Sequence, residues 1–139
     1  MPPVNILITV DSITALSTGA LTENIYLTDD NPYSQDKGTG HLKTNCVRGQ
    51  TITWKALAVD VQSPAVIADI AFVDDIGVTI ESGVDPAPER YVKPRWLTWS
   101  GIIPYRLNPG IYHYRLAIQV ASGKRSTMFT TSPALIVAA

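Results

Sequence analysis

The residues best suited to chemistry in this sequence are two histidines, His41 and His113, the single cysteine Cys46, and Met128. In a β-sandwich these residue types could form the ligand set of a blue-copper site. Such a site needs its cysteine, histidine and methionine close together, whereas Cys46 lies far upstream and only Met128 follows His113. The spacing therefore argues against a metal site. It predicts an exposed His113 and a buried or half-buried Cys46.

Cys46 also lacks the surroundings of a catalytic nucleophile. His41 precedes it by five residues, and an odd spacing along one strand places two side chains on opposite faces. A Cys–His couple would need His113 to approach from elsewhere in the fold. The Gly-x-Ser-x-Gly, His-Glu-x-x-His and Cys-x-x-Cys motifs do not occur. We therefore expect no catalytic residue, no cofactor and no enzyme activity.

Two pairs of acidic residues, Asp29–Asp30 and Asp74–Asp75, each follow a stretch that has strand character. Calcium binds where several oxygen ligands gather from loops, so two such pairs at one end of a sandwich could hold it. Aspartate is also favoured in turns, and solvated turn ends are the interpretation that we prefer. The sequence leaves calcium binding open.

The three tryptophans differ in what their positions predict. Trp54 lies in the middle of a strand on its apolar face, where one large ring typically fills the gap between two sheets. Trp96 and Trp99 are three residues apart, so a strand would place them on opposite faces. We expect one of them in the core and the other exposed, with Tyr105 nearby in sequence. Trp96, Trp99 and Tyr105 are the candidate binding residues.

Composition indicates one globular domain over residues 1–139, with 45% hydrophobic and 17% charged residues. A net charge of -1 gives no field that would attract nucleic acid or an anionic membrane. One cysteine excludes an internal disulfide. The apolar stretch near the N-terminus is short and interrupted, unlike a secretory signal, so we expect a cytoplasmic protein without a membrane partner.

Hydrophobic residues recur mainly with a period of two, which is typical of half-buried strands. This alternation predicts one largely buried inward face that contains Trp54, Tyr112, Tyr114, Leu116 and Ile118. The expected strands are 4–10, 24–29, 42–48, 51–58, 67–73, 96–102, 111–120, 124–130 and 134–138. A helical pattern appears only at 12–20, where Ser12 could be the N-cap and Gly19 the stop. These short strands and frequent turns predict an all-β fold. We expect an antiparallel two-sheet β-sandwich, jelly-roll or immunoglobulin-like, with at most one short helix.

The order of several short segments along the chain resembles that in the PixA/AidA family of bacterial inclusion-body proteins. The segments are NILITVD (5–11), NIYLTD (24–29), GQTITW (49–54), WSG (99–101) and GIYHY (110–114). The resemblance implies a small cytoplasmic bacterial β-sandwich without a known catalytic residue. Its members form crystalline inclusions or appear under cell-density control in host-associated bacteria. This chain departs from the methionine-rich inclusion-forming member in having only Met1 and Met128, which argues against a storage role.

We therefore expect a non-enzymatic structural or interaction protein that self-associates. Charge on exposed faces and edges normally keeps sheets apart, and charged residues are few here. The strands at 4–10 and 134–138 carry no charged side chain, so if either lies at a sheet edge, its exposure in a monomer is unfavourable and it should pair with a second copy. The expected assembly is a two-fold homodimer whose interface includes a terminal strand or the exposed one of Trp96 and Trp99. The alternative is a lectin-like module that binds a small carbohydrate or a host protein.

Overall fold

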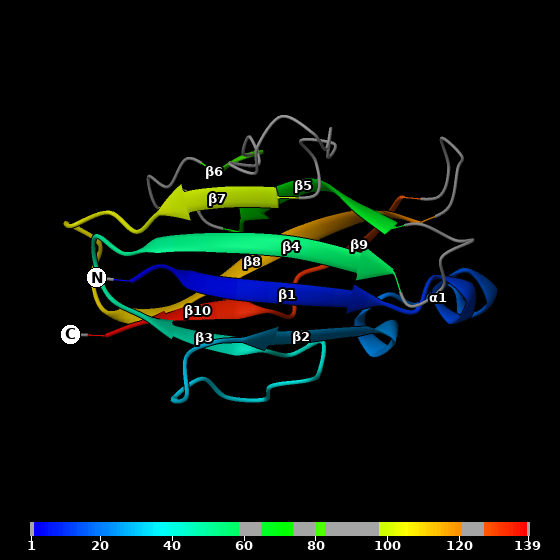
Figure 1. Ribbon diagram of the computed structural model, residues 1–139, viewed down its shortest axis with the longest axis horizontal. Coiled ribbons are helices and arrows are strands. Elements are labelled where there is room, and N and C mark those ends of the chain that lie inside the picture. Colours follow the sequence, from blue (N-terminus) through cyan, green and yellow to red (C-terminus); the bar gives the residue numbers. More distant parts are fainter. Residues whose placement is uncertain (1, 59–64, 74–79, 83–97, 121–126, 139) are drawn as a thin grey trace, which may run out of the picture.

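A computed structural model describes residues 2–58, 65–73, 80–82, 98–120 and 127–138. These residues form ten strands in two sheets that pack face to face (Figure 1). The first sheet has the strand order β2 (Ile25–Asp29), β1 (Val4–Val10), β4 (Thr51–Ala58), β7 (Thr98–Ile102) and β6 (Ile80–Ser82). The second has the order β3 (Lys43–Cys46), β10 (Ala134–Val137), β8 (Gly110–Val120) and β5 (Ala65–Phe72), and β9 (Thr127–Thr130) also pairs with β8. The predicted all-β sandwich is therefore confirmed.

Each of the nine expected ranges contains a strand, and β6 is the strand that the sequence did not predict. Residues 96–97 and 124–126, at the starts of two expected ranges, lie outside the described residues. The expected antiparallel pairing is wrong for two neighbours, because β1 and β4 run parallel and so do β3 and β10. The other strand pairs among the described residues are antiparallel, so both sheets are mixed.

The two terminal strands lie inside their sheets. β1 is hydrogen-bonded to β2 on one side and to β4 on the other, and β10 lies between β3 and β8. The prediction that a terminal strand pairs with a second copy at a sheet edge is therefore wrong. Both strands lack charge because they are covered on both edges, and charged side chains are needed chiefly at open edges.

The core fills the space between the two sheets and follows the period of two. Trp54 from β4 is 1% exposed and Tyr114 from β8 is fully buried, as predicted. Their rings contact edge to face with centroids 5.5 Å apart, the arrangement that the aromatic quadrupole favours. Leu116 and Ile118 are also fully buried, whereas Tyr112, predicted to be largely buried, is partly exposed near the start of β8.

The helix α1 (Ser12–Thr18) begins and ends close to where the sequence predicted. Its N-cap is Asp11 rather than Ser12, because the Asp11 carboxylate accepts a hydrogen bond from the Thr14 backbone N–H at 3.2 Å. Gly19 ends the helix in the left-handed conformation at φ 72°, and a 3₁₀ turn (Thr22–Asn24) leads into β2. The residues that α1 buries are Ser12 and Ala15. In the part of the chain that the structure describes, no helix has the length and hydropathy needed to cross a bilayer.

Candidate functional site

The aromatic residues that the sequence singled out lie on different surfaces. Trp99 is directly opposite Trp54 in the β4–β7 pair, so it points to the inner face, where it is half-buried against the core. Tyr105 is 74% exposed and lies against Gly49 in the turn between β3 and β4, where an added Cβ would be 2.4 Å from the ring. Trp96 lies outside the described residues. Carbohydrate binding by these residues stays a prediction.

The cysteine and the histidines lie on opposite faces of the second sheet. Cys46 points into the core and is 2% exposed, as predicted, and its thiol donates to the Ile136 carbonyl at 3.6 Å. Burial raises the pKa of this thiol to about 12, so it remains protonated and weakly nucleophilic at neutral pH. His41 and His113 are both on the solvent side. The geometry therefore offers no Cys–His couple for catalysis.

Both histidines contact Ser132. The Nδ1 atom of His41 shares a hydrogen bond with the Ser132 hydroxyl, and Nδ1 of His113 donates to the Ser132 carbonyl at 3.1 Å. The Nδ1 atoms of both rings are thus engaged by Ser132. Within the described ranges, no group of three or more histidine, cysteine or acidic residues is placed to hold a metal.

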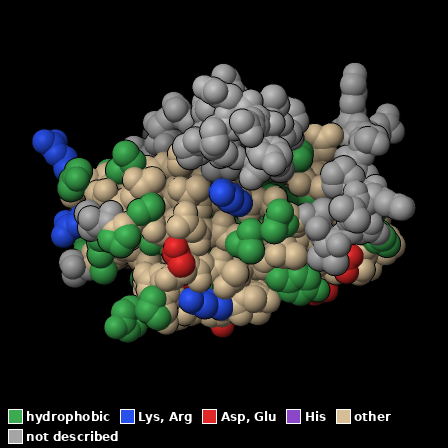
Figure 2. All heavy atoms as spheres, viewed as in Figure 1, with side chains coloured by type: hydrophobic (Ala, Val, Ile, Leu, Met, Phe, Trp, Pro, Cys, Tyr) green, Lys and Arg blue, Asp and Glu red, His purple; other side chains and the backbone are tan. Residues whose placement is uncertain are grey.

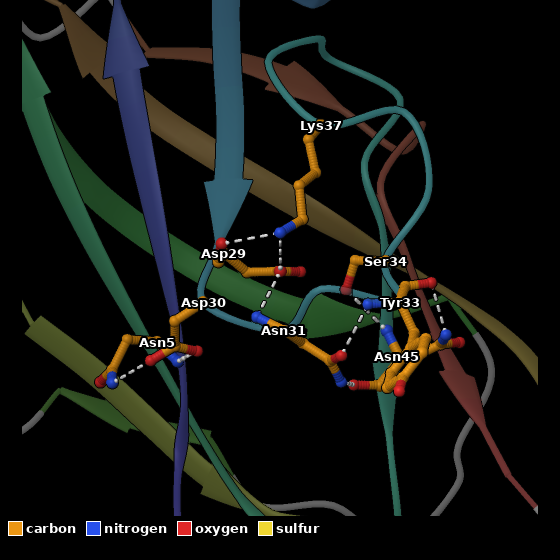
Figure 3. A network of polar contacts seen from close by, with 8 residues as sticks. All are labelled: Asn5, Asp29, Asp30, Asn31, Tyr33, Ser34, Lys37 and Asn45. Carbon is orange, nitrogen blue, oxygen red and sulfur yellow. Dashed lines mark hydrogen bonds and ion pairs between the residues drawn. The ribbon is translucent and has the colours of Figure 1, made fainter.

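Asp29 and Asp30 point in opposite directions at the end of β2 (Figure 3). The Asp29 side chain is fully buried, and one oxygen of its carboxylate lies 3.5 Å from the Lys37 ammonium and accepts a hydrogen bond from the Asn31 backbone at 2.9 Å. Asp30 instead lies on the outer face beside Asn5. The pair therefore does not form a shared calcium site, and Asp74 and Asp75 lie outside the described residues. The interpretation of Asp29 as a solvated turn end is wrong.

The Asp30 carboxylate is held by two donors of Asn5, the side-chain amide at 2.8 Å and the backbone N–H at 3.0 Å. Slight burial opposes ionisation of Asp30, but these hydrogen bonds favour the charged form and outweigh it. The pKa of Asp30 is therefore lowered from its ordinary value. This contact ties the start of β1 to the end of β2.

The segment 30–42 covers the edges of both sheets at once. It pairs with β2 through Gly38 and Thr39, which exchange backbone hydrogen bonds with Leu27 at 2.7 and 3.1 Å. It also pairs with β3, because Gln35 and Lys43 exchange two backbone hydrogen bonds at 2.9 Å. The unpaired backbone groups that an edge strand normally presents are thereby satisfied.

Side-chain amides fix the path of this segment (Figure 3). Asn31 donates from its side chain to the Asn45 carbonyl at 2.7 Å, and Asn45 donates from its own side chain to the Tyr33 carbonyl at 2.6 Å. The Asn31 side chain also accepts from the Tyr33 N–H at 2.9 Å, and the Asn45 N–H donates to the Ser34 hydroxyl at 3.1 Å. The polar residues near Asp29 thus satisfy one another, which indicates a structural role.

A shallow pocket of about 310 Å³ lies beside this network. It is lined by Pro2, Pro3, Val4, Asp30, Asn31, Pro32 and Gln50. The Gln50 amide is already engaged, since it donates to the Pro2 carbonyl at 2.9 Å and accepts from the Val47 N–H at 3.0 Å. None of the lining residues is a nucleophile paired with a base, so the pocket lacks the groups for covalent catalysis.

A second polar group of atoms is buried in the core. Oδ2 of Asp29 and Oγ1 of Thr44 are buried without a hydrogen-bond partner, and Nε1 of Trp54 and Oη of Tyr114 are buried in contact with each other but without a hydrogen bond of normal geometry. Burial, together with the charges of Asp29 and Cys46, raises the pKa of the Tyr114 hydroxyl well above its usual range. The sequence did not reveal this group, although Asp29 continues the inward-facing set of Ile25 and Leu27 and could have been found by that alternation.

Comparison with known proteins gives one family and one solved fold. A model of the family described as a domain of unknown function (DUF8788) matches residues 2–127. The chain belongs to this family. No curated protein matches the sequence.

Among solved structures, this DUF8788 protein resembles the crystal structure of the inclusion body protein PixA from Burkholderia cenocepacia J2315. The TM-score is 0.65 with 11% sequence identity, and the match covers 99% of this chain and 95% of that chain. At this identity the likeness concerns the fold. The resemblance to the PixA/AidA family that the sequence suggested is therefore confirmed as a shared fold.

Proposed function

We propose that this protein is a non-enzymatic structural protein of the bacterial cytoplasm that associates with copies of itself. The observation that carries the proposal is a fold shared over nearly the whole length of both chains with a protein named as an inclusion body protein. The buried Cys46 and the outward histidines agree with a role that needs no catalytic group.

The location of the edges restricts how such association would occur. The terminal strands are internal, and segment 30–42 covers the outer edges of β2 and β3. Addition of a strand from another copy at those edges would require that segment to leave, at the cost of its backbone hydrogen bonds. Sheet faces are therefore better suited than these edges to hold a second copy.

Sedimentation velocity over a concentration series tests the proposal. We expect a mass that rises from monomer to dimer as the protein concentration increases to tens of micromolar. A monomer mass throughout this range would contradict the proposal. Light microscopy of cells that overproduce the protein would show whether association extends to visible inclusions.

Regulation by cell density and contact with a host form a further part of the proposal. They rest on the sequence resemblance to the PixA/AidA family. Transcript levels measured from early growth to stationary phase, with and without host material, test it. We expect a rise at high cell density, and constant transcript levels would remove this part.

A second candidate function is binding of a small carbohydrate. The observation that favours it is Tyr105, whose ring is 74% exposed beside Gly49, because exposed aromatic rings stack on the apolar faces of sugars. A glycan array with wild type and Tyr105→Ala separates the two functions. Binding that is lost in the variant supports this candidate, and no binding by wild type removes it.

A further inference from the structure

On the outer face of the first sheet, the side chains that the structure describes on β2, β1, β4 and β7 carry little charge. The outward-facing residues are Tyr26, Thr28, Asn5, Leu7, Thr9, Thr51, Thr53, Lys55, Leu57, Ser100 and Ile102, which we call the neutral face. Lys55, and Asp30 at the margin beside Asn5, are the charged residues of this face among those whose side chains are described. Tyr26, Leu57 and Ile102 are large apolar side chains with 43%, 56% and 58% of their surface exposed. Figure 2, which looks onto this face, shows few charged side chains among the residues that are coloured.

The outer face of the second sheet is different in composition. Lys43, His113, Arg115 and Asp69 all lie on it, and Arg115 covers the Phe129 ring at 5.4 Å while its guanidinium lies 3.5 Å from Asp69. An interface on that face would have to take these charged groups out of water, which costs free energy. On the neutral face, association buries little charge, mainly that of Lys55. A second copy of this chain is therefore the partner that the neutral face fits.

The neutral face is also large enough for a dimer. Four strands spaced ~4.8 Å apart and five to eight residues long at ~3.3 Å each give a footprint of roughly 19 Å by 16–26 Å. With the side chains that project from it, this footprint approaches the ~800 Å² of accessible surface that each partner contributes to a stable interface. In the part of the chain that is described, no helix lies across this face (Figure 1).

The two charges of this region are placed to complement each other across a two-fold axis. Lys55 is in register with Leu7 and Thr28, and Asp30 follows Thr28 by two residues at the margin of the face. Lys55 and Asp30 are two strands apart across the sheet and two residues apart along the strands. The distance between them is therefore about 12 Å, which is too far for an ion pair within one chain. The midpoint falls on β1 between Asn5 and Leu7. A two-fold axis that lies in the plane of the interface, passes through this midpoint and is at right angles to the line from Lys55 to Asp30 would bring Lys55 of each copy opposite Asp30 of the other.

We propose that the neutral face is the interface of a two-fold homodimer in which Lys55 of each copy pairs with Asp30 of the other. This inference rests on the self-association proposed above and assigns it a surface. The Asp30 carboxylate can accept the lysine as well as its two Asn5 donors, because a carboxylate has about four acceptor sites.

A matched pair of variants tests the surface. Leu57→Glu places a charge on the neutral face, and Ile111→Glu places one on the other sheet at the same exposure, 57% against 56%. We expect Leu57→Glu to raise the dimer dissociation constant at least about tenfold and Ile111→Glu to leave it within about twofold. Circular dichroism and thermal unfolding show that both variants fold. If Ile111→Glu weakens the dimer more than Leu57→Glu, or if both variants weaken it equally, the proposed surface is wrong, although the protein still forms a dimer.

Charge exchange tests the pairing of Lys55 with Asp30. Lys55→Glu alone and Asp30→Lys alone each place like charges together in the homodimer and should weaken it about tenfold or more. An equimolar mixture of the two variants forms a heterodimer in which both contacts are attractive, so mixing should restore the dimer mass. If each variant alone forms a weak dimer and the mixture does not recover the dimer mass, the proposed pairing of Lys55 with Asp30 is wrong. A wild type that is monomeric at every concentration would overturn both this inference and the proposed function.

Discussion

Trp54 is the residue on which core packing depends most. Its ring is 1% exposed, contacts Tyr114 and fills the gap between the sheets. We expect Trp54→Ala to lower the free energy of unfolding by about 3–5 kcal/mol, because it removes a large buried ring and leaves a cavity. Urea denaturation measures this value. Tyr33→Ala, at a 78% exposed ring, is the control and should change stability by less than about 0.5 kcal/mol. Equal effects would contradict the proposed core.

The raised pKa of Cys46 predicts a dependence of stability on alkaline pH. The folded chain keeps the thiol proton up to about pH 12, whereas the unfolded chain loses it near pH 9.0. Stability from this group is therefore complete below pH 9.0 and declines as the pH rises toward 12, by roughly 2 kcal/mol at about pH 10.5. Between pH 9.0 and 12, Cys46→Ala should lose less stability than wild type. The raised pKa of Tyr114 also lowers stability at alkaline pH, but it does so equally in both proteins. Identical pH profiles would show that the thiol is not desolvated.

At the scale of elements, the segment between β2 and β3 is held by close backbone contact. A Cβ at Gly40 would lie 2.1 Å from the Thr22 carbonyl oxygen, so Gly40→Ala must displace backbone. We expect a loss of at least about 2 kcal/mol, as in other overpacked sites. Gly38→Ala is the control, because nothing lies within 4 Å and only its positive φ of 81° is unfavourable. That change should cost about 1 kcal/mol. Thermal unfolding distinguishes them, and a more stable Gly40→Ala would disprove the contact.

At the scale of the whole molecule, the neutral face predicts weak salt dependence of association. Salt screens charged contacts but leaves apolar burial nearly unchanged. The dimer dissociation constant should therefore change by less than about threefold between low salt and 0.5 M salt, since two exposed Lys–Asp pairs contribute little. Sedimentation velocity at both salt concentrations measures this. A dimer formed through the second sheet, with Lys43, Arg115 and Asp69, would respond more strongly.

Strand positions and the direction of many side chains follow from the sequence alone. The period of two placed Trp54 and Cys46 inside and His113 outside, because the direction of a side chain along a strand is a local property. The same alternation would have placed Asp29 inside, but its type and its position before a turn favoured solvent. Its burial depends on Lys37 and Asn31, which reach it from the loop that follows β2.

Strand neighbours were decided only by the tertiary structure. The absence of charge in 4–10 and 134–138 indicated either an interior strand or an edge that binds another copy, and the sequence does not distinguish these. The parallel pairings of β1 with β4 and of β3 with β10 enclose both strands. Such pairings join residues far apart in the chain. They depend on how the two sheets pack as a whole, whereas alternation along a strand records only which face each side chain takes.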